Sequence, residues 1–77
     1  MSTILEAYHR TEALKDGRFI AQVEIISTPD SHTVDTLLRD DDHPCATREE
    51  AEAREVQLAE CWQRKNAPDD SLLEFRS

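Results

Sequence analysis

The chain has 77 residues, enough for one small domain, and it carries 9 Lys and Arg against 17 Asp and Glu, for a net charge of −8. Such an acidic surface repels phosphate backbones, so a general nucleic-acid-binding role is disfavoured. No apolar run approaches the ~20 residues of a membrane-spanning helix, and no basic region followed by an apolar stretch marks a secretory signal. We therefore expect a cytoplasmic protein that does not bind membranes.

Residues 3–14 predict the first strand, because two sets of side chains alternate along them. A turn at Asp16-Gly17 folds the chain back, since glycine adopts positive φ at little cost. Two registers are possible, because a two-residue loop and a three-residue loop shift the pairing by one residue. We prefer the three-residue loop, whose inward-facing set contains no charged residue. That register sets Ala13 opposite Phe19 and Ala7 opposite Ile25.

The second strand is the clearest element of the chain. Its alternation over residues 19–26 places Phe19, Ala21, Val23 and Ile25 on one face and Ile20, Gln22, Glu24 and Ile26 on the other. Turn-forming residues at 28–31 precede a third strand from Thr33 to Leu38. Residues 40–44 are expected to form a charged loop, because Pro44 prevents them from joining a neighbouring element. Short connections predict an antiparallel meander.

A helix is predicted from about Arg48 to Lys65. Thr47 and Glu50 have the spacing of a capping box, in which each side chain bonds to the backbone amide of the other. An apolar stripe is expected to pack on the sheet, with Trp62 mostly buried and Cys61 beside it as a small buried hydrophobe. Glu55 falls within this stripe, where it either bends outward to water or meets a basic group on a partner.

The predicted fold is therefore α+β, a three-stranded antiparallel β-meander with one long C-terminal helix packed on one face. Residues 1–66 form this single β-β-β-α domain. Residues 67–77 are a tail that is acidic and then apolar, and it docks either on its own domain or on another chain.

The sequence contains few groups that could perform chemistry, and we assign no catalytic, cofactor-binding or metal-binding residue. His43 and Cys45 follow Asp40–Asp42, but they lack the four converging ligands of a zinc site. Cys45 precedes a helix N-terminus, although no oxyanion-hole residue accompanies it. The predicted helix holds Cys61 about 21 Å from its start, too far from Cys45 for a disulfide.

Two groups of proteins share features with this chain. Gly17-Arg18-Phe19 and the helix start at Thr47–Ala51, followed by Trp62, resemble small uncharacterised bacterial proteins with a strand-strand-strand-helix order. Pro44-Cys45 leading into the same helix start is similar to the partial double-stranded-RNA-binding-like fold of HicB-type antitoxins. The chain lacks the glycine of that antitoxin motif, and no DNA-binding domain follows the helix. The first resemblance implies no known activity, and the second implies binding to a partner protein.

The combined expectation is a non-enzymatic protein-interaction module that binds an unknown protein or a second copy of itself, as a homodimer. One alternative is an acidic decoy, like an antitoxin or a nucleic-acid mimic, and another is a small thiol-dependent enzyme that uses Cys45. The sheet face left open by the helix would carry the interaction, covered by the tail or by another molecule. The expected interaction residues are Tyr8, Ile20, Ile26, Glu55, Leu72, Leu73 and Phe75.

Overall fold

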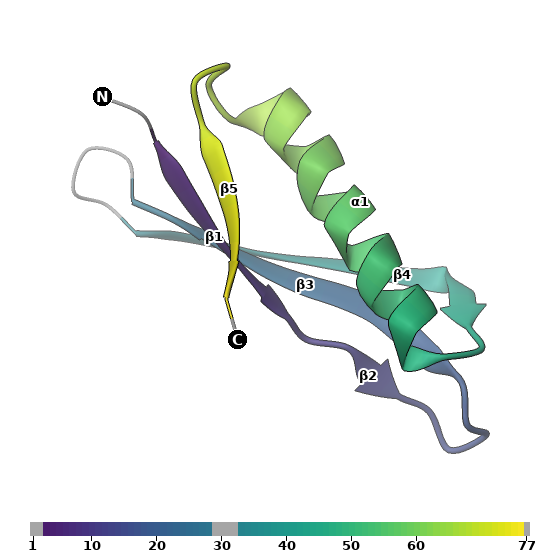
Figure 1. Cartoon of the computed structure of the whole chain (residues 1–77). Helices are drawn as coiled ribbons and strands as arrows, with labels where there is room; N and C mark the ends of the chain where they lie inside the picture. The colour runs from purple at the N-terminus through teal and green to yellow at the C-terminus, as the bar shows by residue number, and fades with distance from the viewer. Residues whose placement is uncertain (1–2, 29–32, 77) are drawn as a thin grey trace.

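The computed structural model describes residues 3–28 and 33–76, so most of the turn predicted at 28–31 lies outside the described residues. Within these ranges the fold is α+β, with one helix and a mixed sheet of five strands (Figure 1). The three-stranded, wholly antiparallel meander was therefore only part of the sheet. The elements are β1 (Ile4–His9), β2 (Glu12–Ala13), β3 (Phe19–Ser27), β4 (Val34–Cys45), α1 (Arg48–Asn66) and β5 (Leu72–Arg76).

The preferred register of the first hairpin is confirmed. Ala7 lies opposite Ile25 and Ala13 opposite Phe19. The amide of Leu14 donates to the carbonyl of Arg18, which encloses a three-residue loop. Gly17 has a φ of +90° in this loop, a conformation that favours glycine. Keeping charged side chains off the inward face was thus sufficient to select the register.

The third strand is longer than expected, because β4 continues through the acidic segment to Cys45. Phe19 pairs with Cys45 and Ala21 with Asp40, so one residue of β3 faces four residues of β4. Pro44 lies within this irregularity, where its missing N–H removes no regular ladder hydrogen bond. The charged loop predicted at residues 40–44 is therefore a bulge in a strand.

The tail docks on its own domain as β5, parallel to β1. Its alternate residues divide between the two faces of the sheet, since Leu73 and Phe75 pack against the core while Leu72 is exposed. The tail thus extends the sheet at the β1 edge and does not lie across its open face (Figure 1). The strand order across the sheet is β4-β3-β1-β5, with β2 continuing β1 along β3.

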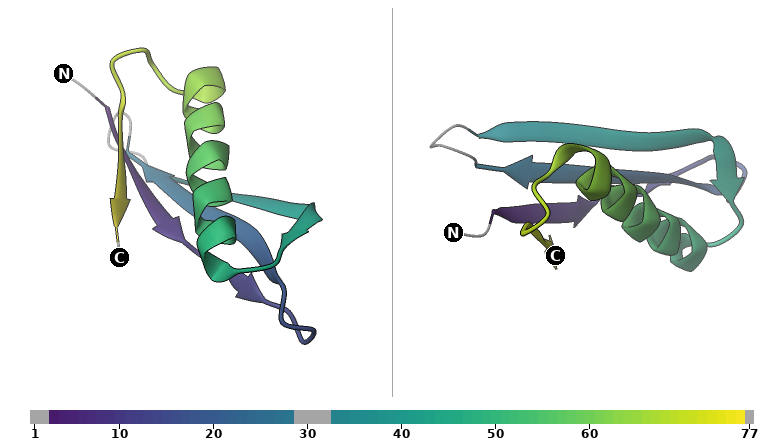
Figure 2. Two further views of the ribbon diagram at one scale, coloured as in Figure 1. Left: turned by 45° about the vertical axis from the view of Figure 1, so that its right-hand side comes forward. Right: turned by 90° about the horizontal axis from the view of Figure 1, so that it is seen from above.

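Helix α1 crosses one face of the sheet, and the other face is left uncovered (Figure 2). Its N-cap is as predicted in one half, because the Thr47 hydroxyl accepts from the amide of Glu50. The Glu50 carboxylate, however, accepts from the amide of Ala46 instead of Thr47. No helix in the described part of the chain is long and apolar enough to cross a membrane.

The core lies between α1 and the sheet, and small residues bring the helix close. The helix positions that face the sheet are Ala51, Glu55 and Ala59, all fully buried. Trp62 is only partly buried, although it packs against the cluster that contains Val23 and Ile25. Cys61 is exposed, contrary to expectation, because two residues of helix place it about 200° around the axis from Ala59.

Candidate functional site

Glu55 is the one charged side chain in the core of the described chain, and its carboxylate has no exposed surface. It accepts hydrogen bonds from His9 Nδ1 at 2.6 Å, the Thr11 hydroxyl at 2.6 Å and the backbone amide of Gln22 at 3.0 Å. Both expectations for Glu55 were therefore wrong, because its partners lie within its own chain rather than in water or on another protein.

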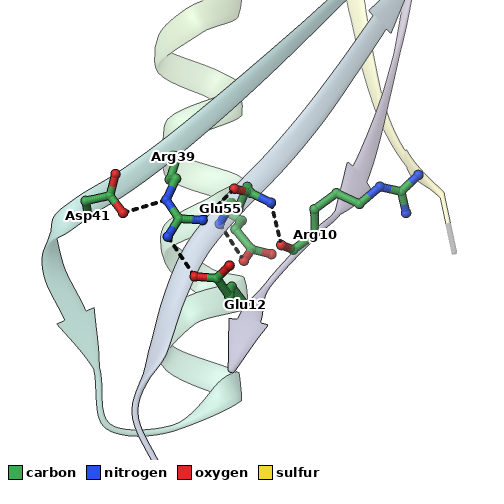
Figure 3. A network of polar contacts seen from close by, with 6 residues as sticks. Arg10, Glu12, Arg39, Asp41 and Glu55 are labelled. Atoms are coloured by element: carbon green, nitrogen blue, oxygen red, sulfur yellow. Dashed lines mark hydrogen bonds and ion pairs between the residues drawn. The ribbon is translucent and has the colours of Figure 1, made fainter. Parts of the chain in front are cut away.

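The Glu55 carboxylate interrupts the pairing between the first strand and β3. Arg10 donates its amide to the Gln22 carbonyl, but the Gln22 amide donates to Glu55 instead of returning to Arg10. The Gln22 side-chain amide then donates to the Arg10 carbonyl at 3.1 Å (Figure 3). With these bonds, the backbone amides and carbonyls of Arg10 and Gln22 all have hydrogen-bond partners, although the regular pairing is broken. This break explains why residues 10 and 11 separate β1 from β2 while the register stays the same.

The geometry around Glu55 supports a structural role. His9 and Thr11 both donate to Glu55, so the imidazole is not positioned to remove a proton from the Thr11 hydroxyl. The His9 ring also stacks on Phe75, with centroids 4.9 Å apart. Three donors compensate the buried carboxylate, which is the condition under which a charge is tolerated in a core.

A wide hollow of about 800 Å³ lies beside this cluster, at the end of β1 and along β2. Arg10, Arg48 and Arg76 line it, together with two glutamates. These arginines already have partners, because Arg10 pairs with Glu24, Arg76 pairs with Glu74, and Arg48 lies over the Phe19 ring. The hollow is thus a polar surface on which two of the three arginines are paired with carboxylates.

His43 and Cys45 are close in sequence, but the imidazole does not contact the thiol. Cys45 Sγ donates to the backbone carbonyl of His43 at 3.7 Å. The His43 ring instead lies 3.1 Å from Asp40, which also accepts from Arg54 at 2.8 Å. The hydrogen bond from His43, followed by that from Arg54, lowers the pKa of Asp40. Among the described residues, no group of three or more His, Cys, Asp or Glu side chains is arranged to hold a metal ion.

The residues expected to form an interaction surface separate into two sets. Tyr8, Ile26 and Leu72 lie on the uncovered face, as the pairing of β1, β3 and β5 requires. Leu73, Phe75 and Glu55 belong to the helix side of the sheet, where Leu73 and Phe75 pack against the core and Glu55 is fully buried.

Ile20 is buried, with 3% of its surface exposed, although an open position was expected. Its cross-strand neighbour is Glu12, and Arg39 crosses β3 to reach Glu12 at 2.7 Å (Figure 3). The ion pair therefore runs over the sheet beside Ile20. Neither partner is adjacent to Ile20 in sequence, so only the sheet register reveals the contact.

Two large apolar side chains on the uncovered face are not among the expected interaction residues. Leu37 is 57% exposed and Ile4 is 48% exposed, beside the expected Leu72 at 54%. Alternation along each strand could have found them, because Leu37 lies in the strand predicted from Thr33 and Ile4 in the strand predicted from residue 3. Their exposure depends on what the helix and the tail leave uncovered.

The different exposure of the two thiols predicts which of them reacts faster. We expect Cys61 to react with a thiol reagent faster than Cys45, because Cys61 is exposed and Cys45 is half-buried. The measurement is the rate of modification of the native single-cysteine variants Cys45→Ala and Cys61→Ala by a chromogenic disulfide. A faster reaction at Cys45 would contradict this order and revive a reactive role for that thiol.

Comparison of the chain with protein-family models, with curated proteins and with solved structures found no match.

Proposed function

We propose that this protein is a non-enzymatic protein-interaction module of the cytoplasm that binds another polypeptide through its sheet. The observation that carries the proposal is the distribution of exposed large apolar residues. In the described part of the chain these residues lie on strands and none lies on α1: they are Ile4, Val34, Leu37 and Leu72. A cytoplasmic location agrees with the two free thiols, which remain reduced in that compartment.

The uncovered face has the mixed character of a binding surface. Leu37 and Leu72 are surrounded by charged residues, such as Asp35 on β4 and Glu74 on β5, rather than forming a continuous apolar layer. Interfaces between soluble proteins commonly combine apolar contacts with polar neighbours in this way. Neither the buried polar cluster around Glu55 nor the polar hollow beside it combines an activated nucleophile with a base, which favours binding over catalysis.

Site-specific photocrosslinking in cells tests the proposal. A benzophenone amino acid at Leu37, on the uncovered face, is expected to form a covalent adduct with one polypeptide. The same probe at Gln57, an exposed position of α1, is the matched control and is expected to form none. Mass spectrometry of the adduct then identifies the bound chain.

The proposal requires that the adduct depend on the position of the probe. Absence of an adduct at Leu37, Ile4 and Leu72 alike would overturn it. Equal adducts at Leu37 and Gln57 would also overturn it, because they would indicate contact without a defined surface.

A further inference from the structure

Strand β4 forms an outer edge of the sheet, and it pairs only with β3 among the described residues. Seen from above in Figure 2, β4 runs along that edge beyond β3. An edge strand has a row of backbone N–H and C=O groups available to another strand. The bulge after Asp40 makes the C-terminal part of β4 irregular and thus a poor partner for another strand, but residues 35–39 pair regularly with β3.

The hydrogen bonds of the sheet identify which residues present these groups. The Gln22 carbonyl accepts from Arg10, so the backbone of Gln22 faces the first strand. Its neighbour Val23 must then face β4, because backbone direction alternates along a strand. Val23 pairs with Leu38, so Leu38 uses its backbone groups toward β3. By the same alternation, the residues whose backbone groups point outward are Asp35, Leu37 and Arg39.

This outward set is complementary to itself. When two copies of β4 pair antiparallel about a two-fold axis at Leu37, Leu37 lies opposite Leu37 of the second copy. Asp35 of each copy then lies opposite Arg39 of the other. Opposite charges in directly facing positions stabilise a strand pair, and six backbone hydrogen bonds join the three facing pairs.

Neighbouring registers lose this complementarity. An axis at Thr36 sets Asp35 opposite Leu37, and an axis at Leu38 sets Leu37 opposite Arg39. Only the axis at Leu37 pairs each charge with an opposite charge and sets the apolar side chain against itself. An interface of this kind is isologous, as in most symmetric dimers.

From this edge we infer that the partner is a second copy of the chain, bound by antiparallel pairing of the two β4 strands about Leu37. The inference rests on the proposed function and names the partner and the surface. The pairing of the two β4 strands joins the two sheets into one continuous sheet. Both helices then lie on the same face, because the two-fold axis is perpendicular to the sheet.

The exposure of Leu37 and the surroundings of Asp35 in the single chain support this dimer. Leu37 is the most exposed large apolar side chain in residues 3–28 and 33–76. A hydrogen bond with Glu24 raises the pKa of Asp35, and Arg10, which pairs with Glu24, opposes this rise only in part. Arg39 of a second copy would bring a further cation beside Asp35, in addition to the contacts that Arg39 makes with Glu12 and Asp41 of its own chain. An apolar groove of about 210 Å³ between Leu38 and Trp62 also lies along this edge.

The first experiment uses position 37, because in the proposed dimer residue 37 of one copy lies opposite residue 37 of the other. In sedimentation equilibrium the natural chain is expected to show twice its 8.8 kDa mass. L37E and L37K are each expected to weaken the dimer at least roughly tenfold, because each repels itself across the axis. An equimolar mixture of L37E and L37K is expected to form a heterodimer, since Glu then faces Lys.

The second experiment tests the flanking charge pair. D35R and R39D each bring like charges together and are expected to be monomeric at concentrations where the natural chain dimerises. Their mixture restores both ion pairs and is expected to dimerise. Glu60 and Arg64 are exposed on α1, so E60R and R64D are matched controls that leave the dimer unchanged. Circular dichroism verifies that each variant is folded.

The outcomes separate the dimer from the proposed function. A monomeric natural chain, or mixtures that stay monomeric, would overturn the β4 dimer. If the Leu37 probe then crosslinks a different protein, the interaction module stands and only the partner is wrong. If the chain dimerises but D35R and R39D dimerise equally well, the two-fold register at Leu37 is wrong.

Discussion

Replacing Glu55 with alanine is expected to lower the free energy of unfolding by about 3–5 kcal/mol. The substitution leaves the Thr11 hydroxyl and the Gln22 amide without their acceptor in a partly buried position, and it removes the hydrogen-bond partner of His9. It also leaves a cavity between α1 and the sheet, where Glu55 is fully buried. Urea denaturation monitored by circular dichroism measures the change. Because so small a domain has little stability in reserve, E55A is expected to be largely unfolded at physiological temperature.

Glu60→Ala is the matched control, because Glu60 lies on the same helix but is exposed. Its effect is expected to be within about 0.5 kcal/mol. If E55A and E60A have the same urea midpoint, the Glu55 carboxylate does not hold the strands as described. An additional check is hydrogen exchange at the Gln22 amide, which is expected to accelerate in E55A as its acceptor is lost.

Removing both inward side chains of β5 is expected to be the second large effect. The double variant Leu73→Ala and Phe75→Ala should lose about 3–5 kcal/mol of stability, because both residues pack against the core cluster and Phe75 stacks on His9. Because Leu73 and Phe75 are only partly buried, we expect each to contribute less than a fully buried side chain would. Thermal and urea unfolding measure the loss.

The alternate residues of the same strand provide the control for β5. The double variant Leu72→Ala and Glu74→Ala changes side chains on the uncovered face, and it should cost less than about 1 kcal/mol. Equal losses from the two double variants would mean that β5 contributes through its backbone pairing alone. A stable L73A and F75A double variant would show that the tail is not part of the folded core.

Local patterns predicted the elements that local chemistry determines. The alternation in β3 predicted its bounds to within one residue, and Gly17 supplied the positive φ of the first loop. The requirement for an uncharged inward face then selected the register, because a one-residue slip exchanges the two faces. Thr47 likewise marked the start of α1, since a hydroxyl at an N-cap satisfies an amide that the helix leaves free.

The expectations that failed depended on contacts between distant parts of the chain. Whether β5 pairs with β1 depends on a free strand edge about 70 residues away in sequence, which composition does not reveal. The length of β4 was underestimated because Pro44 suggested a break, whereas an irregular pairing tolerates a residue without an N–H.

The sequence by itself determined the class of the fold, the first hairpin and the ends of the helix, because turns, caps and alternation act over a few residues. Only the tertiary structure decided the role of Glu55, which the helix pattern placed among apolar neighbours. Its three donors come from residues 9, 11 and 22, and packing alone brings them to residue 55. A buried carboxylate is stable only where such donors converge, so its place in the core depends on the whole arrangement of strands around it.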